Sequence, residues 1–184
     1  MTRESLITVI QTGITPKWAF FWGHTPSKDG SITKSCFSQW WEGHPFMIDG
    51  IVYPTAEHFM MAEKARLFHD QARLAEILAT TSPAIAKKLG RQVSGFNDEV
   101  WLPQRWDIVV RANTAKFSQH APLRQFLLQT GDRILVEASP FDRIWGIGMA
   151  ASHPDAENPS KWKGLNLLGF ALMEVRRQLA ITGA

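Results

Sequence analysis

The dipeptide Asp49-Gly50 lies between two short apolar runs and constrains the fold more than any other feature of the chain. Residues 45–48 precede it and residues 51–53 follow it. Asp-Gly readily adopts the positive φ angles that a two-residue turn between antiparallel strands requires. The pattern therefore predicts a tight β-hairpin. Helical patterns dominate the chain after it, without the regular alternation of strand and helix that indicates a doubly wound sheet.

Helix signals follow the hairpin, each made of a capping residue and an apolar stripe. The expected helices run from Thr55 to about His69, from the cap Asp70 onward, from Ser82-Pro83 to Gly90, from Pro103 onward, from Ala121-Pro122 to Gly131, and from Leu165 to Ala180. On the helix from Pro103, one stripe comprises Trp106, Val109, Val110, Asn113 and Phe117. Short strands are expected at residues 18–22 and 133–137. The predicted fold class is helix-rich α+β, with about six helices, a β-hairpin and a few short strands.

The length and composition fit one domain. The chain has 184 residues and is 45% hydrophobic, which predicts a single domain over residues 18–181 behind a variable or poorly ordered lead-in over residues 1–17. The single cysteine, Cys36, excludes an internal disulfide and favours a reducing, cytoplasmic compartment. No apolar run approaches the ~20 residues that span a bilayer, so no membrane partner is expected. No obligate protein partner is evident from the sequence.

The charge favours a phosphate-bearing ligand over duplex DNA. The formal net charge is +3, and the lysines and arginines are dispersed along the chain. Arg91, at the end of the helix that closes at Gly90, is a candidate phosphate ligand, although favourable charge at a helix end explains it equally well. The six histidines include no pair at the helical i, i+4 spacing, and the common catalytic motifs are missing. Neither a metal site nor a cofactor is expected.

Glu57 and Lys64 are candidates for chemistry on the helix that opens at Thr55. Thr55 has the character of an N-cap, so Glu57 falls in the first turn, where the helix dipole favours an ionised carboxylate. Lys64 lies only ~20° around the helix and ~10 Å along it, so both side chains can reach one pocket. A solvated Glu/Lys pair on an exposed face is the alternative.

A loop after the strand at residues 133–137 gathers candidate binding groups. Gly146 and Gly148 allow a ligand to approach the backbone, and Trp145 offers a face for stacking a heterocyclic base. Asp142 could hydrogen-bond a ribose hydroxyl or a ring N–H. A core tryptophan and turn-forming glycines are the alternative. Asn166 lies just before the last helix, whose N-terminus could bind phosphate, although an ordinary helix cap explains this asparagine too.

The remaining candidates are aromatic. Eight tryptophans are many for this length, and most, including Trp22 and Trp101, lie outside the expected long helices. Tryptophans in loops and short strands often pack a core, but clustered rings also build pockets that stack a planar ligand. The pattern favours a planar ligand.

Together these residues resemble the NADAR family, which includes the YbiA-like N-glycosidases. The resemblance spans about Ala19 to Leu179. The motifs that carry it are Phe20-Phe21, Cys36-Phe37-Ser38 with Trp40-Trp41, Tyr53-Pro54-Thr55-Ala56-Glu57-His58 through Lys64, Ser82-Pro83 with Leu89-Gly90-Arg91, Lys116-Phe117, Leu135-Val136-Glu137 with Asp142 and Trp145-Gly146-Ile147-Gly148, and Asn166-Leu167-Leu168-Gly169 through Leu172-Met173. The loop from Thr25 to Lys34 is longer than in the shortest members.

The resemblance implies cleavage of an N-glycosidic bond between ribose and a base, without a metal or redox cofactor. The implied substrate is a phosphoribosylaminopyrimidine intermediate of riboflavin biosynthesis, which would release ribose 5-phosphate. Glu57 would stabilise the positive charge at C1′ or activate water, and Lys64 would attack C1′ or bind phosphate. With Asp142, these are the expected catalytic residues. The expected substrate-binding residues are Phe20, Phe21, Trp22, Arg91, Trp101, Trp145, Gly146, Gly148 and Asn166.

Two alternative functions stay open at the level of sequence. One is an ADP-ribosyl glycohydrolase that removes ADP-ribose from guanine bases, and only this reading involves nucleic acid as a partner. The lack of a basic stripe argues mildly against it. The other is a non-catalytic module that binds ADP-ribose or NAD through the same aromatic and glycine loops.

Overall fold

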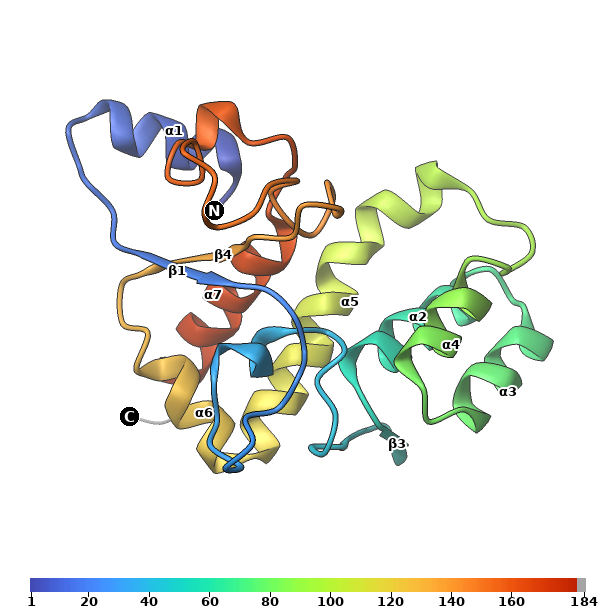
Figure 1. Cartoon of the computed structure of the whole chain (residues 1–184). Coiled ribbons are helices and arrows are strands. Elements are labelled where there is room, and N and C mark those ends of the chain that lie inside the picture. Colours follow the sequence, from blue (N-terminus) through green and yellow to red (C-terminus); the bar gives the residue numbers. More distant parts are fainter. Residues whose placement is uncertain (182–184) are drawn as a thin grey trace. The chain divides into compact units, whose positions relative to one another are not determined.

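Helices supply most of the regular structure. The computed structural model describes residues 1–181 and shows seven α-helices, two short 3₁₀ helices and four strands within them (Figure 1). The helix-rich α+β class is confirmed, with one helix more than the expected six or so. Two units make up the chain: Met1–Ser38 joins the chain from Pro122 onward in the first, and Gln39–Ala121 forms the second. The single domain over residues 18–181 stays a prediction.

A tight hairpin begins the regular structure of the second unit. Strand β2 covers Phe46–Ile48 and pairs antiparallel with β3, Ile51–Tyr53. Asp49 and Gly50 have φ angles of 52° and 77°. Positive φ at both central residues is what a two-residue hairpin turn needs, so the predicted hairpin is confirmed.

Three helices follow, and two of them begin next to a residue whose side chain caps the helix, as the sequence predicts. Their bounds are Ala56–Leu67 for α2, Gln71–Ala79 for α3 and Pro83–Gly90 for α4. The Asp70 carboxylate accepts a hydrogen bond from Arg73 N at 3.0 Å, and Ser82 Oγ accepts one from Ile85 N at 3.4 Å. Both predicted caps are therefore confirmed. Helices α3 and α4 pack against α2 in the second unit (Figure 1).

The long helix α5 begins earlier than predicted. It covers Asp98–Gln119, and Asn97 caps it by accepting a hydrogen bond from Glu99 N at 2.8 Å. The predicted start at Pro103 is wrong, because Pro103 lies inside the helix. The asparagine cap and the acidic first turn favour the earlier start, and they outweigh the one backbone hydrogen bond that a proline removes.

The buried face of α5 carries polar as well as apolar side chains. Val109, Asn113 and Phe117 of the predicted stripe are fully buried, which confirms the centre of that stripe. Lys116 is also buried, at 1% exposure, and it was not expected inside the protein. Helix α5 packs against α2 and β2, so its polar residues face the interior of the second unit.

The N-terminal segment forms a helix, α1, over Arg3–Gln11. Thr2 and Ser5 form a capping box, in which Ser5 N donates to Thr2 Oγ1 at 3.2 Å and Thr2 N donates to Ser5 Oγ at 2.8 Å. Poor order over residues 1–17 is therefore a wrong expectation for this part. The sequence carried a signal that was overlooked, because four apolar residues fall at helical spacing behind the cap: Leu6, Ile7, Val9 and Ile10.

Two parallel strands form the sheet of the first unit. Strand β1, Trp18–Phe21, pairs in parallel with β4, Ile134–Glu137 (Figure 1). Both strands confirm their predicted positions. Parallel strands end at the same edge of a sheet, so the segments after Phe21 and Glu137 start side by side.

Helices α6, Ala121–Leu128, and α7, Leu167–Ile181, follow their predicted patterns closely. Helix α7 packs against β4, and its predicted inward residues Leu168, Leu172, Val175 and Leu179 are all buried. The two 3₁₀ helices are η1, Lys34–Phe37, and η2, Pro159–Lys161. Within residues 1–181, none of the helices has both the length and the apolar character to cross a membrane.

Close packing of α7 on β4 yields a stability prediction. A Cβ added at Gly169 would clash with the backbone oxygen of Leu135 in β4, whereas one added at Gly90 would meet the side chain of Met61. Strand backbone cannot move aside as a methionine side chain can. We expect Gly169→Ala to lower the free energy of unfolding by about 1–3 kcal/mol in urea titrations. Gly90→Ala is the matched control, and a loss for Gly90→Ala equal to or larger than that for Gly169→Ala would contradict the packing argument.

Candidate active site

The first turn of α2 holds the Glu57 side chain inside the protein. Glu57 is 3% exposed, and its backbone N donates a hydrogen bond to Gln39 O at 3.0 Å. The first N–H groups of a helix and its aligned peptide dipoles favour a negative charge at this end. The helix end therefore offsets part of the cost of burying this carboxylate.

Thr55 occupies the predicted N-cap position of α2, with φ −146° and ψ 164°. Its hydroxyl does not cap the helix. Instead it shares a 2.8 Å hydrogen bond with His58 Nδ1. Burial lowers the pKa of His58 to about 4, so the imidazole is neutral at physiological pH. A neutral group therefore lies next to Glu57 along the helix.

Lys64 lies two helical turns from Glu57, and its amine lies over the faces of two aromatic rings. Its Nζ is 4.1 Å from the ring centroid of Phe96 and 5.7 Å from that of Trp101. Lys64 is half-buried, and Trp101 is buried. Aromatic faces attract a cation, so the two rings hold the amine while removing it from water.

The charges around Lys64 are mixed. Burial lowers the pKa of Lys64, and it outweighs the negative charge of Asp98, which raises that pKa. The positive charge of Arg91 lowers the pKa further, and the negative charge of Glu57 raises it. Lys64 therefore holds its proton less tightly than an ordinary lysine. A solvated Glu/Lys pair is the wrong interpretation of this helix face, because one partner is buried and the other half-buried.

Four predicted residues thus come together in the second unit: Glu57, Lys64, Arg91 and Trp101. Sequence reasoning missed Phe96 and Asp98, since the predicted start of α5 left both in an undefined loop. The run from Asn97 to Glu99, an N-cap followed by two acids, is the signal that could have found them.

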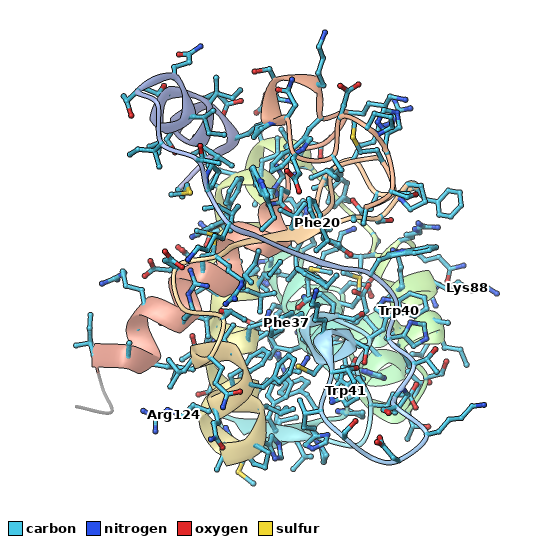
Figure 2. All side chains as sticks on the ribbon, turned by 60° about the vertical axis from the view of Figure 1, so that its left-hand side comes forward. Phe20, Phe37, Trp40, Trp41, Lys88 and Arg124 are labelled. Carbon is cyan, nitrogen blue, oxygen red and sulfur yellow. The ribbon has the colours of Figure 1, made fainter. Side chains whose placement is uncertain are left out.

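One lysine at the basic end of α4 makes a cation–π contact with a tryptophan. Lys87 Nζ lies 5.5 Å from the ring centroid of Trp40, whereas Lys88 points away from the helix into solvent (Figure 2). Arg91 is the C-cap residue of α4 and is exposed. An exposed guanidinium at this end is free to bind an anion from solution.

The other predicted residues lie in the first unit, where three consecutive rings stand at the end of β1 and directly after it. Phe20 lies on β1 (Figure 2). It is half-buried and stacks on Trp18 with ring centroids 6.1 Å apart. Phe21 is buried edge-on against Phe37 at 5.4 Å, which gives it a core role. Trp22 is 58% exposed, so it is the ring of the three that is most open to a ligand.

Asp142 shapes the loop that follows β4. Its Oδ1 accepts hydrogen bonds from Ile144 N and Trp145 N, both at 2.8 Å, and its own N donates to Ser139 Oγ at 3.1 Å. These bonds close a turn and leave the Trp145 ring half-buried. The observed role of Asp142 is to shape this turn, and its catalytic role stays a prediction.

The two glycines of this loop are required by its own packing. A Cβ at Gly146 would lie 2.8 Å from Glu137 O, and Gly148 has a φ angle of 67°. Turn-forming glycines, the alternative considered for this loop, therefore account for both. Their contact with a ligand stays a prediction.

Asn166 uses both its amide oxygen and its amide nitrogen within the protein. Oδ1 accepts a hydrogen bond from Glu137 N and Nδ2 donates one to Leu135 O, both at 2.9 Å, while the backbone φ angle is 56°. The side chain thus extends the ladder of β4 and does not cap α7. Its role in substrate binding stays a prediction.

Metal-ligating side chains do not gather anywhere in residues 1–181: no group of three or more histidines, cysteines or acidic residues is placed to hold an ion. Cys36 is buried.

Comparison with known proteins gives consistent matches over most of the chain. The NADAR domain family matches residues 20–180. N-glycosidase R617 of Acanthamoeba polyphaga mimivirus is 39% identical over 172 residues, covering 89% of this chain and 97% of the relative. N-glycosidase YbiA of Escherichia coli (strain K12) is 37% identical over 147 residues, covering 80% of this chain and 81% of the relative. The NMR structure of the E. coli protein YbiA matches with a TM-score of 0.71 and 34% identity, over 91% of this chain and 88% of that one.

The charges around Lys64 yield a prediction about its pKa. Arg91→Met removes a positive charge, so we expect the pKa of Lys64 to rise; Glu57→Gln removes a negative charge, so it should fall. A pH titration of the Lys64 side-chain NMR signals measures both. Arg73→Met on α3, where Arg73 pairs with Glu76, is the control and should leave the Lys64 titration unchanged. Shifts opposite in sign to these would show that the cluster is assembled wrongly.

Proposed function

This chain belongs to the NADAR family, and we propose that it is an N-glycosidase, a hydrolase that cleaves the bond between a sugar and a nitrogenous base. The relatives named N-glycosidase support the reaction class. The observation that carries the proposal for this chain is the pair on α2: a buried carboxylate, Glu57, electrostatically coupled to a half-buried lysine, Lys64, whose pKa is lowered.

The proposed substrate is a phosphoribosylaminopyrimidine intermediate of riboflavin biosynthesis. Hydrolysis would release the free base and ribose 5-phosphate. The net charge of +3 suits a phosphorylated substrate, and the exposed guanidinium of Arg91 offers a ligand for its phosphate group. The enzyme would work in the reducing cytoplasm, where the buried thiol of Cys36 stays reduced.

Glu57 acts on the charge that develops at the sugar. As the bond from C1′ to the base nitrogen lengthens, C1′ and the ring oxygen become positively charged. A carboxylate held in place before the reaction stabilises that charge without having to be reorganised. Burial strengthens the effect, because the attraction between charges is less screened away from water.

Lys64 is the proposed nucleophile. Burial raises the fraction of neutral amine, which is the form that attacks carbon. The amine bonds to C1′ as the electron pair of the C1′–N bond leaves with the base, which takes up a proton. Loss of a proton from the lysine nitrogen and opening of the sugar ring give a Schiff base. Water then releases ribose 5-phosphate and restores the amine.

Trp101 and Phe96 flank the Lys64 amine, and the buried Trp101 ring helps to remove that amine from water. Trp22 and Trp145, each described in the first unit, are proposed as stacking residues for a planar base. The remaining predicted binding residues are proposed on the family resemblance alone: Phe20, Phe21, Gly146, Gly148 and Asn166.

Replacing the carboxylate tests the proposal. We expect Glu57→Gln to lower kcat by roughly 10²- to 10⁴-fold with the fold intact, because the amide keeps the shape of the side chain and loses its charge. Turnover is read as released base and ribose 5-phosphate by mass spectrometry. Glu63→Gln on the same helix is the matched control: Glu63 pairs with Arg66, and its replacement should leave kcat nearly unchanged.

The same assay separates the proposed reaction from its alternatives. A folded Glu57→Gln variant with normal turnover would end the assignment of Glu57. Release of ADP-ribose from ADP-ribosylated guanosine, with no reaction on the aminopyrimidine, would show that the substrate is an ADP-ribosylated base and not the riboflavin intermediate. Tight binding of ADP-ribose without release of any base would indicate a binding module.

A further inference from the structure

Two buried amide side chains lie in the second unit and bond to each other. Gln39 is 6% exposed and Asn113, on α5, is completely buried. Asn113 Nδ2 donates to Gln39 Oε1 at 2.8 Å and to the backbone oxygen of Val109 at 2.9 Å. Both protons of the Asn113 amide are therefore used.

Each amide keeps one polar atom without a hydrogen-bond partner among residues 1–181: Nε2 of Gln39 and Oδ1 of Asn113. The orientation of the pair follows from its surroundings. Turning the Asn113 amide over would set its oxygen against the Val109 oxygen, and two acceptors repel each other. Gln39 must then present its oxygen to Asn113. One donor and one acceptor are left, and buried polar atoms rarely stay unpaired.

The amide pair is joined to the turn that carries Glu57. Gln39 O accepts the hydrogen bond from Glu57 N at 3.0 Å, so the residue that holds the backbone of this turn also carries the unpaired Nε2. Helix α5, which carries Asn113, packs against α2. One backbone hydrogen bond therefore connects the amide pair to the turn that carries the carboxylate of the proposed active site.

We propose that Gln39 and Asn113 together bind one hydroxyl group, the 2-hydroxyl of the substrate's ribose, and so select ribosyl over deoxyribosyl compounds. The hydroxyl oxygen accepts a hydrogen bond from Gln39 Nε2, and its proton is donated to Asn113 Oδ1. A hydroxyl is a small neutral group that supplies both functions at once, whereas a phosphate has only acceptors and an ammonium only donors.

The proposal rests on the proposed function, which places C1′ beside Glu57. Of the ribose hydroxyls, the one on C2 is next to C1′. Hydrogen bonds to this hydroxyl strengthen as charge develops at the neighbouring carbon, so the amide pair would also favour the transition state. A bound water offers the same donor and acceptor as a sugar hydroxyl. The experiment must therefore tell whether the amide pair holds a water or the hydroxyl of the sugar.

Calorimetry with two sugar phosphates makes that separation. We expect the wild-type protein to bind ribose 5-phosphate roughly 10- to 100-fold more tightly than 2-deoxyribose 5-phosphate, because the deoxy sugar leaves both buried atoms unpaired. Gln39→Met should weaken ribose 5-phosphate binding and bring the ratio close to one. Gln104→Met, at an exposed position on α5, is the matched control and should keep the wild-type ratio.

A second measurement needs no variant. In the wild-type protein, the side-chain NH₂ signals of Gln39 in ¹H–¹⁵N NMR spectra should shift on addition of ribose 5-phosphate and stay in place with the deoxy sugar. If the pair holds only a water, these signals respond to neither sugar, and Gln39→Met weakens both equally or not at all. That result would overturn the hydroxyl site alone.

The outcomes also separate this inference from the proposed function. Wild-type binding of both sugars with equal affinity would overturn the hydroxyl site and leave the N-glycosidase proposal intact. Failure to bind either sugar would overturn the phosphoribosyl substrate and the hydroxyl site with it.

Discussion

A carboxylate without water around it is costly, so the first turn of α2 has to supply what water would. The helix end favours the negative charge of Glu57, and Gln39 fixes the backbone of the turn through its carbonyl oxygen. His58, the next residue, is buried and neutral. The proposed roles of the other groups depend on this turn, because it holds Glu57 in place. These groups are Lys64, with its lowered pKa, and the unpaired amide atoms of Gln39 and Asn113.

Local signals predicted the parts of the fold that depend on a few adjacent residues. Asp49-Gly50 determined the hairpin because both residues take positive φ, and Ser82 marked a helix start because its hydroxyl bonds within the first turn. Weak or conflicting signals failed. Helix α1 is only nine residues long, and its capping box and apolar spacing were overlooked. Pro103 favours a helix start, but α5 already begins after its cap, Asn97.

The same distinction between local signals and long-range packing applies to the residues of the site. Glu57 and Lys64 share a helix, so their spacing along the chain already placed them on one face. Phe96 and Asp98 meet Lys64 only through the packing of α5 on α2, which no local pattern announces. Gln39 was missed for the same reason, since its partner Asn113 lies 74 residues further along the chain.

The central claim is that the carboxylate and the amine of α2 meet at one sugar carbon. A crystal structure with bound ribose 5-phosphate tests it most directly. We expect C1 of the sugar within contact distance of both the Glu57 carboxylate and Lys64 Nζ, or covalently joined to that nitrogen. A sugar bound with C1 remote from both groups, in a protein that still releases base from its substrate, would contradict the account.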